Sequence, residues 1–179
     1  PGTQPFQSGY VKLVCSKAVF ANVLFSFWSA TGVKFSEATV FSSVYEYSTH
    51  YSFEKEVMFD QTENARLGVA FANLHSYRTS TFKIKLFDNF GVEQASGELE
   101  VAAETATAKF IDEIISVPIQ KGFLRISSES YHREGADIQE LWHPLNASIV
   151  GLRYTGTAFT TVPPTCARWK SSENVYVTC

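Results

Sequence analysis

The chain has 179 residues and a formal net charge of -3 at pH 7, and 45% of its residues are hydrophobic against 18% that are charged. This balance excludes a disordered chain, because enough apolar surface is present to form a core, and it excludes the basic field that holds nucleic-acid phosphates. The longest apolar run, residues 18–28, is interrupted by Asn22 and Ser26 and is too short for a transmembrane helix.

The first quarter of the chain predicts a leader and three strands. Residues 1–8 are rich in Pro, Gln and Gly and are expected to be loosely held. Strands are expected at residues 9–16 and 19–28, ahead of the turn-forming residues 30–32. Residues 35–53 alternate most regularly and predict one strand with an aromatic stripe, interpreted as core, with a partner-protein interface or a carbohydrate-stacking platform as alternatives. The stripe comprises Phe41, Tyr45, Tyr47, Tyr51 and Phe53.

The next stretch sets the fold class. Residues 54–66 are charged and polar and predict a linker or a wide loop. Large and small side chains alternate over residues 67–72, and apolar and polar ones over residues 81–86, which is the period of half-buried strands. The polar residues between these strands predict that they form a central hairpin. The turn-forming residues 88–91 predict that the chain then reverses into a third strand near residues 97–103.

Four apolar side chains at helical spacing predict one short helix near residues 105–115, ending before a proline. These side chains are Phe110, Ile111, Ile114 and Ile115. Strands are expected at residues 122–127 and 147–155, on either side of a polar loop at residues 128–145. The whole pattern predicts one all-β domain over residues 9–164, an antiparallel β-sandwich, immunoglobulin-like or jelly-roll-like, of about nine to eleven strands.

The polar loop collects chemically distinctive side chains at residues 131–143. Two histidines and three carboxylates lie there, together with Tyr131 and Trp142. Histidine and carboxylate are zinc and calcium ligands, but their spacing fits no dedicated motif, so no metal site is predicted. We interpret the loop as solvated, with Trp142 packed on the sandwich. Alternatively, Tyr131 and Trp142 anchor a partner protein.

Three cysteines, Cys15, Cys166 and Cys179, allow one disulfide. We expect Cys166 to pair with Cys179, which would close a C-terminal tail at residues 165–179, and a bond from Cys15 to either of them is the alternative. A first residue that is Pro rather than Met, few lysines, and abundant Ser and Thr predict a processed, exported chain.

Two segments resemble each other. Residues 9–13 (GYVKL) and residues 122–126 (GFLRI) share the order glycine, aromatic, aliphatic, basic, aliphatic. Each is followed within about 30 residues by a long apolar segment, which indicates a weak internal repeat. In that case related strand pairs at residues 9–60 and 122–164 pack around residues 66–103. The alternative is that strands after a glycine simply look alike.

Four short patterns precede Pro163 in a fixed order: LGVAFAN at residues 67–73, FIDEI at 110–114, GFLRI at 122–126 and GLRY at 151–154. Together they resemble a β-sandwich module that recurs in large exported bacterial surface proteins. The resemblance covers residues 67–163 and, more loosely, the chain from Gly9 onward. It implies an exported, non-enzymatic accessory or adhesive domain whose motifs are structural. The loop at residues 128–145 and the tail at residues 165–179 depart from the module.

The sequence holds no nucleophile elbow, phosphate-binding loop or metal-binding helix, so no catalytic residue and no cofactor are predicted. We predict a non-enzymatic subunit, exported to the periplasm, the cell surface or the medium, that assembles with other protein chains. Its expected contacts are Tyr131 and Trp142. The alternative is a carbohydrate-binding module that uses Tyr45, Tyr47 and Tyr51.

Overall fold

The computed structural model describes residues 21–41, 52–129, 147–170 and 175–178, and the single residues 11, 13, 16, 17 and 19. Side chains are described at these positions except at residues 27, 41, 52–53, 129, 166–170 and 175–178. Besides strands and turns, these ranges contain two short 3-10 helices, Thr62–Asn64 (η1) and Ile111–Glu113 (η2). No helix in the described ranges is long and apolar enough to span a membrane.

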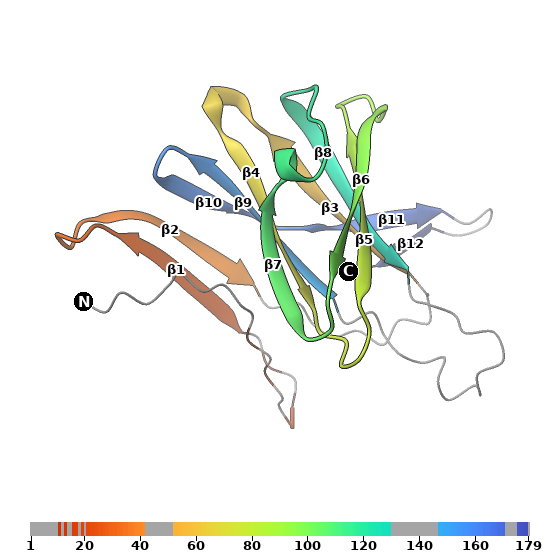
Figure 1. The fold of residues 1–179 in the computed structure, drawn as a ribbon, viewed down its shortest axis with the longest axis horizontal. Coiled ribbons are helices and arrows are strands. Elements are labelled where there is room, and N and C mark those ends of the chain that lie inside the picture. Colours follow the sequence, from red (N-terminus) through yellow and green to blue (C-terminus); the bar gives the residue numbers. More distant parts are fainter. Residues whose placement is uncertain are drawn as a thin grey trace.

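The described residues form twelve strands, ten of which make two antiparallel sheets, of four and six strands, that pack as a sandwich (Figure 1). The four-stranded sheet has the order β10 (Ala158–Val162), β9 (Ala147–Thr155), β4 (Arg66–Asn73), β7 (Thr105–Phe110). The six-stranded sheet has the order β12 (Val175–Thr178), β11 (Thr165–Lys170), β3 (Ser52–Asp60), β8 (Lys121–Glu129), β5 (Ser80–Phe87), β6 (Glu93–Val101). The other two strands, β1 (Asn22–Trp28) and β2 (Lys34–Phe41), pair in a separate hairpin. The predicted all-β antiparallel sandwich is confirmed.

The core lies between the two sheets because β4 and β5 turn large apolar side chains inward at every second position. The buried side chains are Leu67, Val69 and Phe71 of β4 and Phe82, Ile84 and Leu86 of β5. The rings of Phe71 and Phe82 lie 5.2 Å apart across the core. β4 and β5 belong to opposite sheets, so the predicted central hairpin is wrong although both strands are present.

Asn73, the last residue of β4, organises the crossing from one sheet to the other, and its side chain is fully buried. Its Nδ2 donates hydrogen bonds to the carbonyl oxygens of Arg78 at 2.7 Å, Val101 at 3.0 Å and Ala102 at 3.2 Å. Its Oδ1 accepts a hydrogen bond from the His75 N–H at 3.0 Å. The side chain thereby satisfies backbone groups that a hairpin ladder would otherwise have paired.

The reversal predicted after β5 is confirmed, because β5 and β6 form an antiparallel hairpin. Asp88 closes its turn: Oδ1 accepts hydrogen bonds from the N–H groups of Phe90 at 2.8 Å and Val92 at 2.9 Å. β6 begins at Glu93, ahead of the predicted residues 97–103.

Two other segments differ from their predicted structure. β3 covers most of the predicted linker at residues 54–66, because Val57 and Phe59 enter the core while Met58 between them faces solvent. β7 and η2 stand where a helix was predicted near residues 105–115, so that prediction is wrong. Threonine and alanine alternate in β7, and Ala106 and Ala108 pair with small residues of β4. This period of two prevails over the helical spacing of the isoleucines that follow.

The N-terminal predictions are met in part. β1 lies within the strand predicted at residues 19–28. In the segment 9–16, Val11, Leu13 and Ser16 are described and lie outside any strand. The strand predicted at residues 35–53 has its two ends in different sheets, since β2 belongs to the hairpin and β3 to the six-stranded sheet.

The strands predicted at residues 122–127 and 147–155 are confirmed as β8 and β9. β8 lies so close to β5 that a Cβ at Gly122 would overlap the carbonyl oxygen of Phe87. Glycine is therefore required at the start of this strand for a steric reason. After β10, Thr165 of β11 pairs with Glu56 of β3, which extends the six-stranded sheet.

Candidate functional site

The binding residues predicted from the sequence all lie outside the described residues. They are Tyr45, Tyr47 and Tyr51 of the aromatic stripe and Tyr131 and Trp142 of the polar loop. Their part in binding stays a prediction.

The predicted disulfide is also undecided. Cys15 and Cys179 lie outside the described residues, and Cys166 is described only in its backbone, within β11. Ala167 of β11 pairs with Thr178 of β12, and these residues adjoin Cys166 and Cys179 in the sequence. This register agrees with the predicted pairing, which stays a prediction.

The β1–β2 hairpin is the described element whose surface is most apolar. β1 has the sequence NVLFSFW, in which apolar residues occupy adjacent positions, so both faces of the strand carry apolar side chains. The two strands pair along their length. Ser29 closes the turn, because its Oγ accepts hydrogen bonds from the N–H groups of Thr31 at 3.2 Å and Val33 at 2.9 Å.

Ser36 attaches β2 to the edge of the four-stranded sheet. Its Oγ donates a hydrogen bond to the carbonyl oxygen of Phe159 in β10 at 2.7 Å and accepts one from the Phe159 N–H at 2.8 Å. One hydroxyl therefore satisfies both backbone groups of an edge residue. Ala38, on the same face of β2, is buried. The hairpin is held through β2, which leaves β1 on the outer side (Figure 1).

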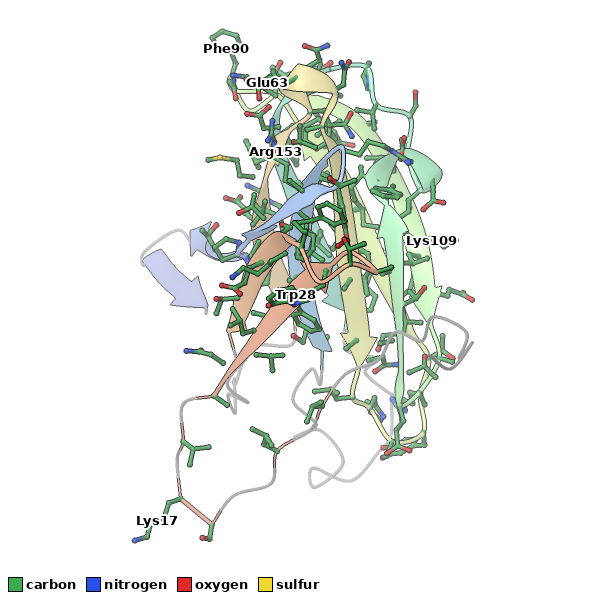
Figure 2. The ribbon with its side chains drawn as sticks, turned by 90° about the vertical axis from the view of Figure 1, so that its left-hand side faces the viewer. Lys17, Trp28, Glu63, Phe90, Lys109 and Arg153 are labelled. Carbon is green, nitrogen blue, oxygen red and sulfur yellow. The ribbon has the colours of Figure 1, made fainter. Side chains whose placement is uncertain are left out.

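Large apolar side chains of the hairpin face solvent. Leu24 is 60% exposed, Trp28 54% and Phe25 52%, and Val23 and Val33 are exposed as well. We call these five residues the hairpin surface. Figure 2 shows Trp28 on the hairpin, in front of the sandwich. Among the described residues, nine of the thirteen exposed large hydrophobic residues lie between positions 11 and 35, so this exposure is concentrated in one part of the sequence.

A small polar cluster borders the hairpin surface. Lys34 Nζ lies 2.9 Å from Glu37 Oε2, and Ser26 Oγ donates a hydrogen bond to the same oxygen at 2.9 Å. The hydrogen bond from the Lys34 ammonium, which has the larger effect, and the one from the Ser26 hydroxyl lower the pKa of Glu37. Lys34 Nζ also lies 5.9 Å from the centre of the Trp28 ring. An apolar patch edged by polar groups has the composition of a protein–protein interface.

A cavity of about 440 Å³ opens at one end of the sandwich, near Glu63 and Arg153 (Figure 2). Arg153 donates hydrogen bonds from Nε to the Asp60 carbonyl oxygen at 3.1 Å and from Nη2 to the Thr62 carbonyl oxygen at 3.0 Å. Hydrogen bonds from the Thr62 hydroxyl and N–H lower the pKa of Asp60. These contacts stabilise the turn between β3 and β4, so Arg153, the arginine of the GLRY pattern, has a structural role.

A second charged cluster lies on the outer face of the six-stranded sheet. The rings of Phe87 and Phe123 stack at 5.1 Å, and the Arg125 guanidinium lies 5.0 Å and 5.9 Å from their centres. Arg125 also pairs with Glu56 at 2.8 Å and with Glu54 at 3.4 Å. The basic residue of GFLRI is therefore held by carboxylates of the neighbouring strand β3.

In the part of the chain that the structure describes, no group of three or more His, Cys, Asp or Glu side chains is placed to hold a metal ion. Comparison with protein-family models, curated proteins and solved structures finds no match for this chain. The hairpin surface, as the largest group of exposed apolar side chains among the described residues, is the candidate site. The sequence predicted a strand there but not its exposure; the one available signal was the run of adjacent apolar residues in β1.

Proposed function

We propose that the protein is a non-enzymatic, exported structural or accessory subunit that assembles with another protein, and that the hairpin surface is its contact. The observation that carries the proposal is β1, a strand with exposed apolar residues on both faces and no described partner strand other than β2. Strands that are apolar on both faces occur in sheet interiors, where both faces are covered. An exposed strand of this kind is a template for pairing with another chain.

The energy available at this surface is considerable. Burying a large apolar side chain is worth roughly 1.5–3 kcal/mol, and because Leu24, Phe25 and Trp28 are already about half covered, roughly 1 kcal/mol remains to be gained from each. Tryptophan is among the side chains that contribute most to protein interfaces. The proposal of export and of a bacterial source comes from the sequence resemblance alone. The carbohydrate-binding alternative depends on tyrosines outside the described residues.

The proposal is tested by placing a photo-crosslinking phenylalanine analogue at Phe25 of the chain expressed in the cells that produce it. Irradiation should yield a covalent adduct that mass spectrometry identifies as an exported protein. The matched control carries the analogue at Phe90, which is 92% exposed at the far end of the molecule (Figure 2). Equal adducts from both positions, or none from Phe25, would refute the proposal, and so would retention of the chain in the cytoplasm.

A further inference from the structure

The matched segments 9–13 and 122–126 are each followed by an antiparallel hairpin of similar construction. β8, which contains residues 122–126, precedes the hairpin β9–β10, and residues 9–13 precede the hairpin β1–β2. Both hairpin turns contain a glycine with positive φ, Gly32 at 81° and Gly156 at 61°. The second strand of each hairpin has Phe at its second position and Ser or Thr at its third. The similarity expected from the sequence therefore extends to the hairpins but not to the segments before them, because Val11 and Leu13 lie outside any strand whereas residues 122–126 lie within β8.

Matching residues of the two copies lie in opposite environments. Leu124 and Ile126 of β8 are 0% exposed, whereas Val11 and Leu13, which match them in sequence, are 78% and 60% exposed. Ile149 of β9 is 2% exposed, whereas β1 has large apolar residues exposed on both faces. The same apolar pattern is core in one copy and surface in the other.

The complete copy shows what covers these residues. β8 is flanked by β3 and β5, and β9 is flanked by β10 on one side and β4 on the other. β4 offers β9 a face of small residues, with Gly68 opposite Leu152 and Ala70 opposite Val150. Among the described residues, β1 pairs with β2 alone, so the position that β4 takes beside β9 has no counterpart beside β1.

We propose that residues 22–41 are the last strands of a second sandwich, and that their partner is a separate β-sandwich module that lacks these strands and adds a β4-type strand to β1. The inference rests on the proposed function and names the partner. A second copy of this chain does not offer that strand, because its β4 is already paired with β7 and β9. The partner strand should alternate large inward residues with small outward ones, as Leu-Gly-Val-Ala-Phe-Ala does in β4.

Small outward residues are required because bulky rings pack over them. In the complete copy, a Cβ at Gly68 would lie 3.3 Å from the Tyr154 ring, which packs in turn against Phe110 and Phe159. The aromatic residues of β1 would need the same clearance on their neighbour. A partner strand with large side chains on both faces would hold β1 away and prevent ladder hydrogen bonds.

The test uses the full chain and a fluorescently labelled synthetic peptide that copies residues 64–75, with blocked termini. Fluorescence anisotropy should show saturable binding, and hydrogen exchange should show new protection at residues 22–28. The double variant Leu24→Lys with Phe25→Lys should bind at least about tenfold more weakly. The matched control, Phe90→Lys with Val92→Lys, removes two exposed apolar residues elsewhere and should bind as the wild type does. The peptide with Ala70→Pro, which breaks the ladder, should not bind.

Three results would overturn the inference: no binding of the peptide, protection that appears at the chain's own β4 neighbours instead of residues 22–28, or a chain that dimerises with residues 22–28 already protected. The first of these, combined with a specific adduct from Phe25, would refute the β4-type partner and leave the assembly function intact. Failure of both experiments would refute both proposals.

Discussion

Replacing Asn73 with Ala should lower the free energy of unfolding by about 3 kcal/mol, as worked from its hydrogen bonds. The amide has two hydrogens, so the three carbonyl oxygens within 3.2 Å share two donated bonds, and Oδ1 accepts a third from His75. Each neutral bond contributes about 1 kcal/mol net, and carbonyls left buried without a donor increase the loss. For a domain of this size the melting temperature should fall by about 6–12 °C.

Urea unfolding followed by circular dichroism, together with scanning calorimetry, measures this loss. Asn22→Ala, at the exposed start of β1, is the matched control and should change the free energy of unfolding by less than about 0.5 kcal/mol. A loss below about 1 kcal/mol for Asn73→Ala would mean that the crossing from β4 to β5 is stabilised by other contacts, and the role assigned to Asn73 would be refuted.

Gly122→Ala should lower the free energy of unfolding in urea by about 1–3 kcal/mol, because the new Cβ overlaps the backbone of β5. Gly68→Ala should cost less, because its closest new contact is a side-chain ring at 3.3 Å, and equal losses would refute the steric argument. Hydrogen bonds from the N–H of Val92 and other turn groups lower the pKa of Asp88, so its stabilising effect is present above its unfolded pKa and is lost as the pH falls through its lower folded pKa. Asp88→Asn should therefore flatten the fall of stability below about pH 4 in acid unfolding, and an unchanged slope would contradict this. Non-reducing peptide mapping should recover Cys166 linked to Cys179, and a peptide linked through Cys15 would contradict that pairing.

The sequence predicted strands well wherever large and small residues alternate with one face in the core. Residues 67–72 and 81–86 are such cases, and the turn at residues 88–91 followed from residues that tolerate tight backbone. The sequence did not predict the sheet to which each strand belongs, because a polar connection can join two strands of one hairpin or two strands of opposite sheets. Here Asn73 stabilises the crossing between the sheets, and one of its hydrogen-bond partners is the carbonyl oxygen of Val101, which is distant in sequence.

The prediction of a helix near residues 105–115 was wrong for a related reason. Ile111 and Ile115 share a helical spacing and do form one turn, with the Ile115 N–H bonded to the Ile111 carbonyl oxygen at 3.0 Å. Single turns and full helices give the same local pattern of apolar residues. Apart from its last residue, Phe110, the strand β7 before this turn has only small and polar residues on its two faces, so its period of two carries little hydrophobic contrast.

The candidate site was the least predictable feature, because exposure depends on partners and not on local pattern. The apolar run in β1 predicts a buried strand, and in the described structure it is a strand that is not buried. The attachment of the hairpin depends on Ser36 meeting Phe159, which is 123 residues away in sequence. Nothing in the alternation of either strand signals that contact.

The internal repeat makes one further prediction about charge. Lys12 matches Arg125 in sequence, and Arg125 pairs with Glu56 of β3 at 2.8 Å. If residues 9–13 bind the partner as residues 122–126 pair with β3, the partner module should place a carboxylate of its β3-type strand opposite Lys12. Because the Arg125–Glu56 pair is partly exposed, such a pair is worth at most about 1 kcal/mol, or about a fivefold change in the association constant.

Reversing the charge with Lys12→Glu should therefore reduce the yield of the Phe25 photo-adduct several-fold, since attraction is replaced by repulsion across the interface. The matched control is Lys17→Glu, which makes the same charge change at an exposed position outside the matched segment (Figure 2). High salt should lower the yield of the wild-type adduct and reduce the difference in yield between the two variants. Equal adduct yields from Lys12→Glu and Lys17→Glu would mean that the match between residues 9–13 and 122–126 does not extend to the partner's charges.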